Sequence, residues 1–146
     1  MKVILDTNIL VSSLIIPASP PHQIYEAWRA GIFVLVTCEE QLEEFRRVTR
    51  YDKLRAYIEP AAAGALLNEL RKIAQHVGKL PKVKRSTDAG DDYLLALAQV
   101  ADAEYLVTGD RSGLLALKRH VKTRIVTARQ FCSAVTPKAR PRGRSR

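Results

Sequence analysis

The chain has 146 residues, of which 47% are hydrophobic and 27% charged, and its formal net charge is +9. This length and composition predict one globular domain with a core of its own. No apolar run approaches the roughly 18 residues of a membrane span, which excludes a membrane-spanning chain. The early acid at Asp6 is not typical of a signal peptide, so we expect a cytoplasmic protein.

Apolar periodicity and turn residues predict alternating strands and helices. In chain order we expect a strand over residues 2–5, helices over 8–16 and 22–30, a strand over 33–37, helices over 39–50, 53–58 and 60–77, a short strand over 82–84, a helix over 91–101, a strand over 104–108, a helix over 114–119, a strand over 124–126 and a helix over 128–134. This alternation indicates an α/β domain with a parallel sheet and helices on both faces.

The two ends of the chain differ in composition. Residues 1–136 carry the predicted elements, whereas residues 137–146 hold five positive charges, no acid and almost no apolar residue. This composition predicts a disordered basic tail, which either binds nucleic acid through its phosphates or only aids solubility. The cysteines, Cys38 and Cys132, are far apart and outside any CxxC motif, so we expect free buried thiols, with a disulfide or zinc site as the alternative.

Two predicted strands end in an acid. VILD ends at Asp6 and YLVTGD at Asp110. Ligands of open parallel sheets bind beyond the carboxyl ends of the strands, so both acids should reach the same edge. Thr7 and Asn8 are expected to support Asp6 by hydrogen bonding.

Further acids are candidates for the same edge. On the predicted helix CEEQLEEFRRV, at about 100° per residue, Glu44 is the glutamate closest to the apolar stripe. In STDAGDDYLLALA, Asp88, Asp91 and Asp92 precede an apolar helix, where they either cap its free N–H groups or point into the cleft.

Asp6, Glu44, Asp91 and Asp110 would thus place up to four carboxylates at one end of the sheet. Carboxylates that close cannot all stay ionised without a counter-charge. An all-carboxylate site favours Mg²⁺ or Mn²⁺ over zinc. On a basic protein, such a site suggests metal-assisted attack of water on a phosphodiester.

Four stretches carry a family resemblance: ILDTNIL, QLEEFRRV, DAGDDYLLALA, and ADAEYLVTGD followed by LLAL. In this order, over roughly residues 1–130, they resemble the PIN-domain family, and within it the toxin components of toxin–antitoxin systems related to VapC-type ribonucleases. The resemblance implies a three-layer α/β/α sandwich with a central, mainly parallel sheet. It also implies an endoribonuclease dependent on Mg²⁺ or Mn²⁺, a homodimer and a small antitoxin partner that covers the site.

Carried over residue by residue, the resemblance makes Asp6, Asp91 and Asp110 metal ligands. Glu44 would help to bind the metal or orient the attacking water, and Asn8 and Thr108 would support the acids. The chain departs from the family pattern at TGDRSGLL, where Ser112 and Gly113 stand in place of a further acid. That departure leaves open a catalytically weak PIN fold that only binds RNA or a protein.

Basic residues near these acids are candidates for RNA phosphate contacts. They are Arg46, Arg47, Lys82, Lys84, Arg85 and Arg111. Because aromatic residues are few, phosphate contacts rather than base stacking should dominate RNA binding. A haloacid-dehalogenase-like phosphatase is a weaker alternative, since Asn8 stands where that class needs a second acid.

Overall fold

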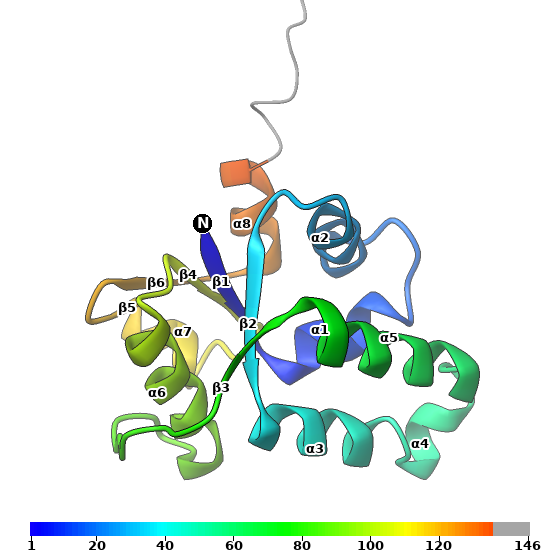
Figure 1. Ribbon diagram of the computed structural model, residues 1–146, viewed down its shortest axis with the longest axis horizontal. Coiled ribbons are helices and arrows are strands. Elements are labelled where there is room, and N and C mark those ends of the chain that lie inside the picture. The colour runs from blue at the N-terminus through cyan, green and yellow to red at the C-terminus, as the bar shows by residue number, and fades with distance from the viewer. Residues whose placement is uncertain (136–146) are drawn as a thin grey trace, which may run out of the picture.

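Six strands form one sheet in the order β3-β2-β1-β4-β6-β5 in the computed structural model, which describes residues 1–135 (Figure 1). All neighbouring strands are parallel except β5, which pairs antiparallel with β6. The strands are β1 (Lys2–Leu5), β2 (Val34–Cys38), β3 (Gln75–Val77), β4 (Tyr105–Val107), β5 (Arg119–His120) and β6 (Thr123–Val126). The predicted α/β class with a mainly parallel sheet is therefore confirmed.

Helices cover both faces of this sheet. The first layer comprises α1 (Thr7–Ser13), α2 (Pro20–Arg29), α3 (Glu39–Val48), α5 (Pro60–Ile73) and α8 (Ala128–Val135). The second layer comprises α6 (Asp92–Ala101), preceded by the 3-10 turn η1 (Ala89–Asp91), and α7 (Leu114–Leu117). The short α4 (Asp52–Arg55) joins α3 to α5. Figure 1 shows α6 and α7 on the left of the sheet and α2, α3 and α5 on its right.

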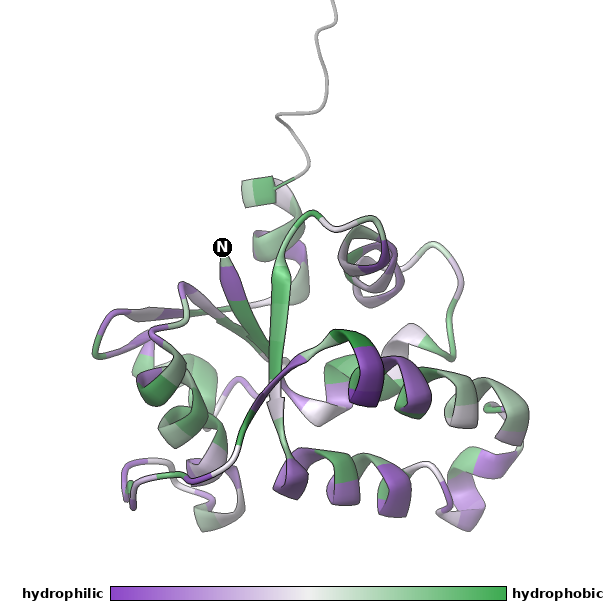
Figure 2. Cartoon of the chain, in the orientation of Figure 1, coloured by the Kyte–Doolittle hydropathy of each residue, from purple (hydrophilic) through white to green (hydrophobic). Residues whose placement is uncertain are grey.

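Residues of β1 alternate between the two layers. Val3 and Leu5 pack in the core beneath the first layer, whereas Ile4 packs with α6, and all three are at most 2% exposed. A strand buried on both faces is apolar throughout, which explains the VIL run before Asp6. Figure 2 shows the same pattern in β2, which is hydrophobic along most of its length, while α3 and α5 alternate hydrophobic and hydrophilic residues.

The expected helix over residues 60–77 is too long. Helix α5 ends at Ile73 because Ala74 takes extended backbone angles, and Gln75–Val77 then pairs with β2 as β3. The apolar residues Ile73 and Val77 fit a helical stripe, but Ile73 is 60% exposed. The stripe therefore spans a helix and a strand rather than one helix.

Three smaller expectations are also wrong. Residues 82–84 form no strand, and α1 stops at Ser13 instead of continuing to residue 16. Helix α7 ends at Leu117 because Lys118 has a φ of 64°, which a helix cannot accommodate. The next two residues form β5.

Residues 1–135 contain no helix that is long and apolar enough to span a bilayer. No disulfide joins Cys38 and Cys132; Cys38 is buried, as expected, whereas Cys132 is only half-buried. The predicted basic tail, residues 137–146, lies outside the described part of the chain.

Candidate active site

Asp6 lies at the junction of β1 and α1. Its backbone N–H donates to the Val107 carbonyl at 2.9 Å, and its side chain is the N-cap of α1. The Asn8 backbone N–H donates to Oδ1 at 3.2 Å, and the Thr108 hydroxyl donates to Oδ2 at 2.7 Å. Asp6 is only 6% exposed, and this burial is the main reason that its pKa lies above the ordinary value. The carboxylate is thus fixed in place, but its charge is only partly compensated.

Thr108 connects the ends of the two central strands. The register of β1 and β4 aligns Leu5 with Val107, so the residues after them meet at one edge of the sheet. The Thr108 hydroxyl donates to Asp6 and accepts from the backbone N–H of Asp110 at 3.1 Å. One buried side chain therefore sets the relative position of Asp6 and Asp110.

The loop after β4 closes around the Asp110 carboxylate. The Gly113 backbone N–H donates to Asp110 Oδ1 at 3.1 Å. A Cβ atom at Gly113 would lie 2.0 Å from Asp110 Oδ2, a distance that no side chain can accept. The departure at Ser112–Gly113 thus has a structural consequence, because the glycine leaves room for the carboxylate of Asp110.

Glu44 is held from two other elements. The Thr7 hydroxyl donates to Glu44 Oε1 at 2.6 Å, and the Tyr93 hydroxyl donates to the same oxygen. Burial is the main cause of the raised pKa of Tyr93, so this phenol stays protonated and remains a donor. Thr7, expected to support Asp6, supports Glu44 instead, and Asn8 reaches Asp6 through its backbone.

Tyr93 is a site residue that the sequence pattern did not indicate. Its signal is weak, because an aromatic residue in the first turn of an apolar helix is equally typical of a core position. The helix that carries it, α6, packs against β1 and β2.

One open cavity of about 570 Å³ brings the candidate acids together. It is lined by Asp6, Asn8, Ile9, Ser12, Glu44, Asp88, Asp91, Gly109 and Asp110. We call it the acidic cavity. The four acids singled out from the sequence all line it, and Asp88 is a fifth.

Asp91 shows the electrostatic cost of this arrangement. Partial burial, followed by the charges of Asp6, Asp88 and Asp110, raises its pKa from 3.8 to about 7. Its side chain makes no capping hydrogen bond to α6, although the residue occupies the N-cap position. Capping therefore does not explain this aspartate.

The neighbouring aspartates, Asp88 and Asp92, do accept backbone hydrogen bonds. Asp88 accepts from the Gly90 backbone N–H at 2.9 Å while also lining the acidic cavity. Asp92 accepts from the backbone N–H groups of Arg85 and Ser86 at 3.1 and 2.8 Å, and it does not line the cavity. Asp92 thus holds the preceding loop and does not supply the acid that the family pattern has at Ser112–Gly113.

The donors of the acidic cavity are oxygen atoms, which suit Mg²⁺ or Mn²⁺. Burial and, to a smaller extent, the neighbouring carboxylates raise the pKa values of Asp6 and Asp91, so a cation would favour their ionised forms. Within residues 1–135, however, no three His, Cys, Asp or Glu side chains already converge closely enough to hold a metal ion. The residues therefore fit such an ion by their chemistry and their shared cavity, and no metal cage is formed in advance.

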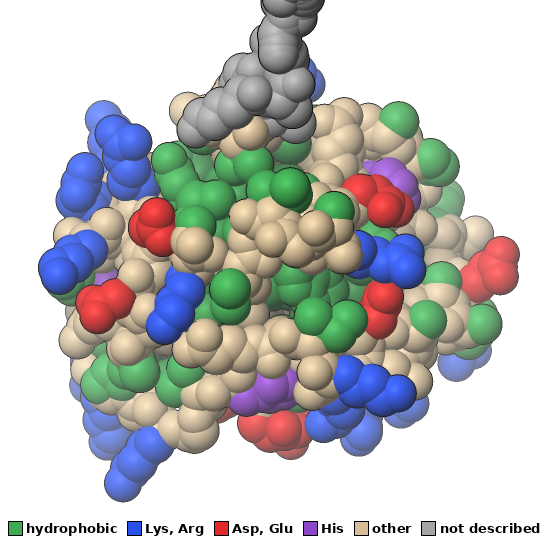
Figure 3. All heavy atoms as spheres, turned by 45° about the horizontal axis from the view of Figure 1, so that its top comes forward, with side chains coloured by type: hydrophobic (Ala, Val, Ile, Leu, Met, Phe, Trp, Pro, Cys, Tyr) green, Lys and Arg blue, Asp and Glu red, His purple; other side chains and the backbone are tan. Residues whose placement is uncertain are grey.

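The basic candidates occupy different places. The Arg85 guanidinium donates to the Arg119 carbonyl at 2.8 Å and lies 2.8 Å from His120 Nδ1, so it anchors its loop to β5. Lys82, Lys84 and Arg111 are exposed. Figure 3 shows Lys and Arg side chains spread around the rim of one face, with acidic residues between them.

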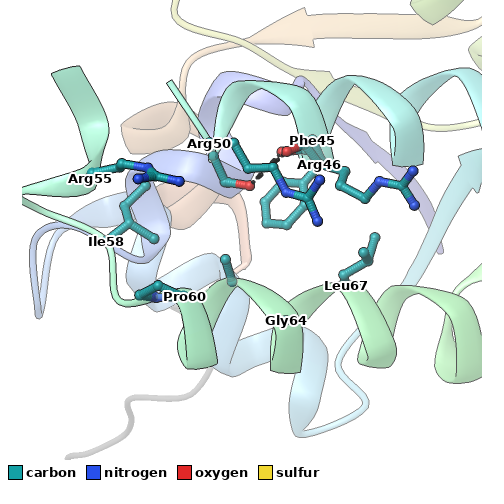
Figure 4. A pocket seen from close by; sticks show the side chains of 10 residues that line it. Phe45, Arg46, Arg50, Arg55, Ile58, Pro60, Gly64 and Leu67 are labelled. Carbon is teal, nitrogen blue, oxygen red and sulfur yellow. Dashed lines mark hydrogen bonds between the residues drawn. The ribbon is translucent and has the colours of Figure 1, made fainter. Parts of the chain in front are cut away.

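Arg46 and Arg47 lie on α3, close to Glu44 in sequence but outside the acidic cavity. Arg46 lines a hollow of about 210 Å³ between α3 and α5, with Arg50 and Arg55 also at its rim (Figure 4). Arg46, Arg47 and Arg50 also line a second hollow of about 430 Å³ beside Tyr51.

Comparisons with known proteins agree with this fold. In structure, the chain is similar to VapC20 of Mycobacterium tuberculosis, a sarcin–ricin-loop-cleaving toxin, with a TM-score of 0.53. The two share 15% identity over 84% of this chain and 98% of that one, so the likeness concerns the fold. No curated protein matches the chain in sequence. A family model described as PIN domain matches residues 2–112, and the chain therefore belongs to the PIN domain family.

Proposed function

We propose that this protein is an endoribonuclease that hydrolyses RNA phosphodiester bonds with the help of Mg²⁺ or Mn²⁺. The observation that carries the proposal is the acidic cavity, where Asp6, Glu44, Asp91 and Asp110 surround one open space at the carboxyl edge of the sheet. Membership of the PIN domain family and the fold shared with an RNA-cleaving toxin support it. The family match also favours this activity over the phosphatase alternative.

In this proposal Asp6, Asp91 and Asp110 hold the cation. A bound divalent cation would offset negative charge on the scissile phosphate and lower the pKa of water. Thr108 positions Asp6 and Asp110 relative to each other, because its hydroxyl contacts both residues.

Glu44 orients the attacking water and accepts its proton. The hydroxyls of Thr7 and Tyr93 both donate to Oε1, which holds this oxygen in place. Among the described residues this leaves Oε2 as the oxygen available to a water molecule. A base held in this way costs little reorganisation during the reaction.

The biological role that follows is that of a toxin in a toxin–antitoxin pair. A toxin that cleaves the RNA of its own cell needs an inhibitor, and a small antitoxin protein that covers the acidic cavity would supply it. We also propose a homodimer, as the family resemblance implies. Expression should arrest growth, and a small neighbouring reading frame should relieve the arrest.

The test is cleavage of a labelled single-stranded RNA by the purified chain. We expect cleavage with Mn²⁺ or Mg²⁺ and none with EDTA. Asp6→Asn should reduce the rate by more than about 100-fold, because removing a ligand costs more than the 10–100-fold typical of a ligand's supporting contact. Asp102→Asn is the matched control, since Asp102 ends α6 in a left-handed conformation that asparagine accepts.

Full activity in Asp6→Asn, or activity that survives EDTA, would contradict the proposal. RNA binding without cleavage by the wild-type chain would favour the alternative of a catalytically weak PIN fold.

A further inference from the structure

A third hollow, separate from the two that Arg46 lines, opens directly beside the acidic cavity. It measures about 330 Å³, which is within the size range of small-ligand sites. It shares Asn8 and Ser12 with the acidic cavity, so an extended ligand can pass from one space to the other along the protein surface. The remaining lining residues are Val11, Ile15, Val48, Tyr51, Lys53 and Leu54, and we call this space the side hollow.

The lining of the side hollow combines apolar walls with a few polar groups. The aliphatic side chains come from α1, the segment after it, α3 and α4. Lys53 is exposed at the same place, and none of the described residues that line the hollow is acidic. This combination suits a flat, largely apolar ligand that is attached to a negative charge.

Tyr51 gives the side hollow an aromatic surface in a fixed position. The residue is 41% exposed, so one face of the ring is open to a ligand. Its backbone N–H donates to the Val48 carbonyl at 3.1 Å, and its own carbonyl accepts from the Leu54 N–H at 2.9 Å. The Arg47 side chain lies beside its hydroxyl. The backbone that carries the ring is therefore held in place, so the ring can stack on a ligand at a small entropy cost.

We propose that the side hollow binds one unpaired RNA base, stacked on Tyr51, next to the phosphate that enters the acidic cavity. The proposal rests on the ribonuclease function proposed above and adds a subsite that favours single-stranded RNA. A duplex keeps its bases stacked inside, so only an unpaired base can enter the hollow.

The surface beyond Tyr51 supports this path. The hollow on the other side of Tyr51 is lined by Arg46, Arg47 and Arg50, with Glu43 as its acid. Arg46 and Arg50 then reach the hollow between α3 and α5 (Figure 4). A strand leaving the side hollow thus meets arginines suited to its phosphates.

The experiment compares two single-stranded oligonucleotides of equal length and charge, one with ordinary bases and one with abasic sugars throughout. Affinities are measured in EDTA, so that binding is read without cleavage. For the wild-type chain we expect the oligonucleotide with bases to bind about tenfold more tightly than the abasic one, as one stacked base would provide. Tyr51→Ala should remove most of this preference.

Three variants serve as controls. Tyr51→Phe keeps the ring and should keep the preference. Tyr57→Ala removes a tyrosine that is 65% exposed in the same segment but does not line the hollow, and it should have no effect. Lys53→Ala should weaken both oligonucleotides equally, because its charge contacts phosphate rather than a base.

A base preference that is unchanged in Tyr51→Ala, while the wild-type chain cleaves RNA, would contradict the subsite alone. A wild-type chain that binds neither oligonucleotide in EDTA would contradict the subsite, whereas a wild-type chain that cleaves no RNA with Mg²⁺ or Mn²⁺ would contradict the proposed function. Loss of the preference in Tyr57→Ala as well would show that the effect does not come from the side hollow.

Discussion

The acidic cavity should destabilise the fold when no cation is bound, and Asp91 allows this to be measured. Its pKa is raised from 3.8 to about 7, mainly by partial burial and then by neighbouring carboxylates. A shift of that size corresponds to about 4 kcal/mol. Because Asp91 is only half-buried, solvent screens part of this, and we expect about 1–2 kcal/mol.

The direction in which stability changes with pH follows from proton binding. Between pH 4 and pH 7 the folded state holds a proton on Asp91 that the unfolded state has lost, so the wild-type chain loses stability as the pH rises. Asp91→Asn removes this penalty. In EDTA the variant should be as stable as the wild type near pH 4, and its advantage should grow up to pH 7 and then stay constant. No capping bond is lost, because the Asp91 side chain makes none.

Thermal unfolding in EDTA at pH 5 and pH 8 is the assay. The expected rise in Tm at pH 8 is roughly 3–8 °C. Asp92→Asn is the matched control, because Asp92 accepts two backbone N–H bonds and its loss of charge should lower the Tm. Equal Tm values for Asp91→Asn and wild type at pH 8, or a lower value for the variant, would refute this electrostatic account.

Three further changes have expected outcomes. Thr108→Val removes the buried hydrogen bond to Asp6 Oδ2. It should lower the free energy of unfolding by about 1–2 kcal/mol, measured by denaturation, and the cleavage rate by about tenfold, measured on RNA. Gly113→Ala should reduce cleavage at least tenfold, because the new Cβ would lie 2.0 Å from Asp110 Oδ2 and displace that carboxylate. Arg85→Ala should lower the free energy of unfolding by about 0.5–1 kcal/mol, since its solvent-exposed anchor on β5 is lost.

Each of these expectations has a control. Thr108→Ser keeps the hydroxyl and should retain most of the cleavage rate. Gly64 lies in helix α5, where a Cβ atom would meet no described atom of a neighbouring element within 4 Å. Gly64→Ala should therefore leave cleavage unchanged and stabilise the helix slightly. Lys82→Ala should not change stability, because Lys82 is exposed. Cleavage at the wild-type rate in Gly113→Ala would show that the position of Asp110 does not matter.

The strand ends were predictable from the sequence because two independent signals coincide there. The apolar run before Asp6 marks a strand buried on both faces, and a parallel sheet places the end of β1 beside the end of β4. Glu44 was predictable as a member of the same edge from its angle to the apolar stripe of α3. The family and fold predicted from these motifs are confirmed.

The supporting contacts were less predictable. Thr7 follows Asp6 directly, yet its hydroxyl turns to Glu44, which is 37 residues away. Arg85 comes shortly before Asp88 and Asp91 in the sequence, but its guanidinium binds the backbone of β5. Local charge and spacing do not encode such contacts, because they depend on how distant elements pack. The strand β3 was missed for a related reason, since its pairing with β2 outweighs the helical pattern of its three residues.

Anomalous X-ray diffraction from crystals soaked in Mn²⁺ would locate the cation that the proposed ribonuclease needs. We expect a manganese peak in the acidic cavity between Asp6, Asp91 and Asp110, and no such peak in crystals of Asp6→Asn. Manganese bound only elsewhere on the chain, or no bound manganese at concentrations that support RNA cleavage, would contradict the proposal.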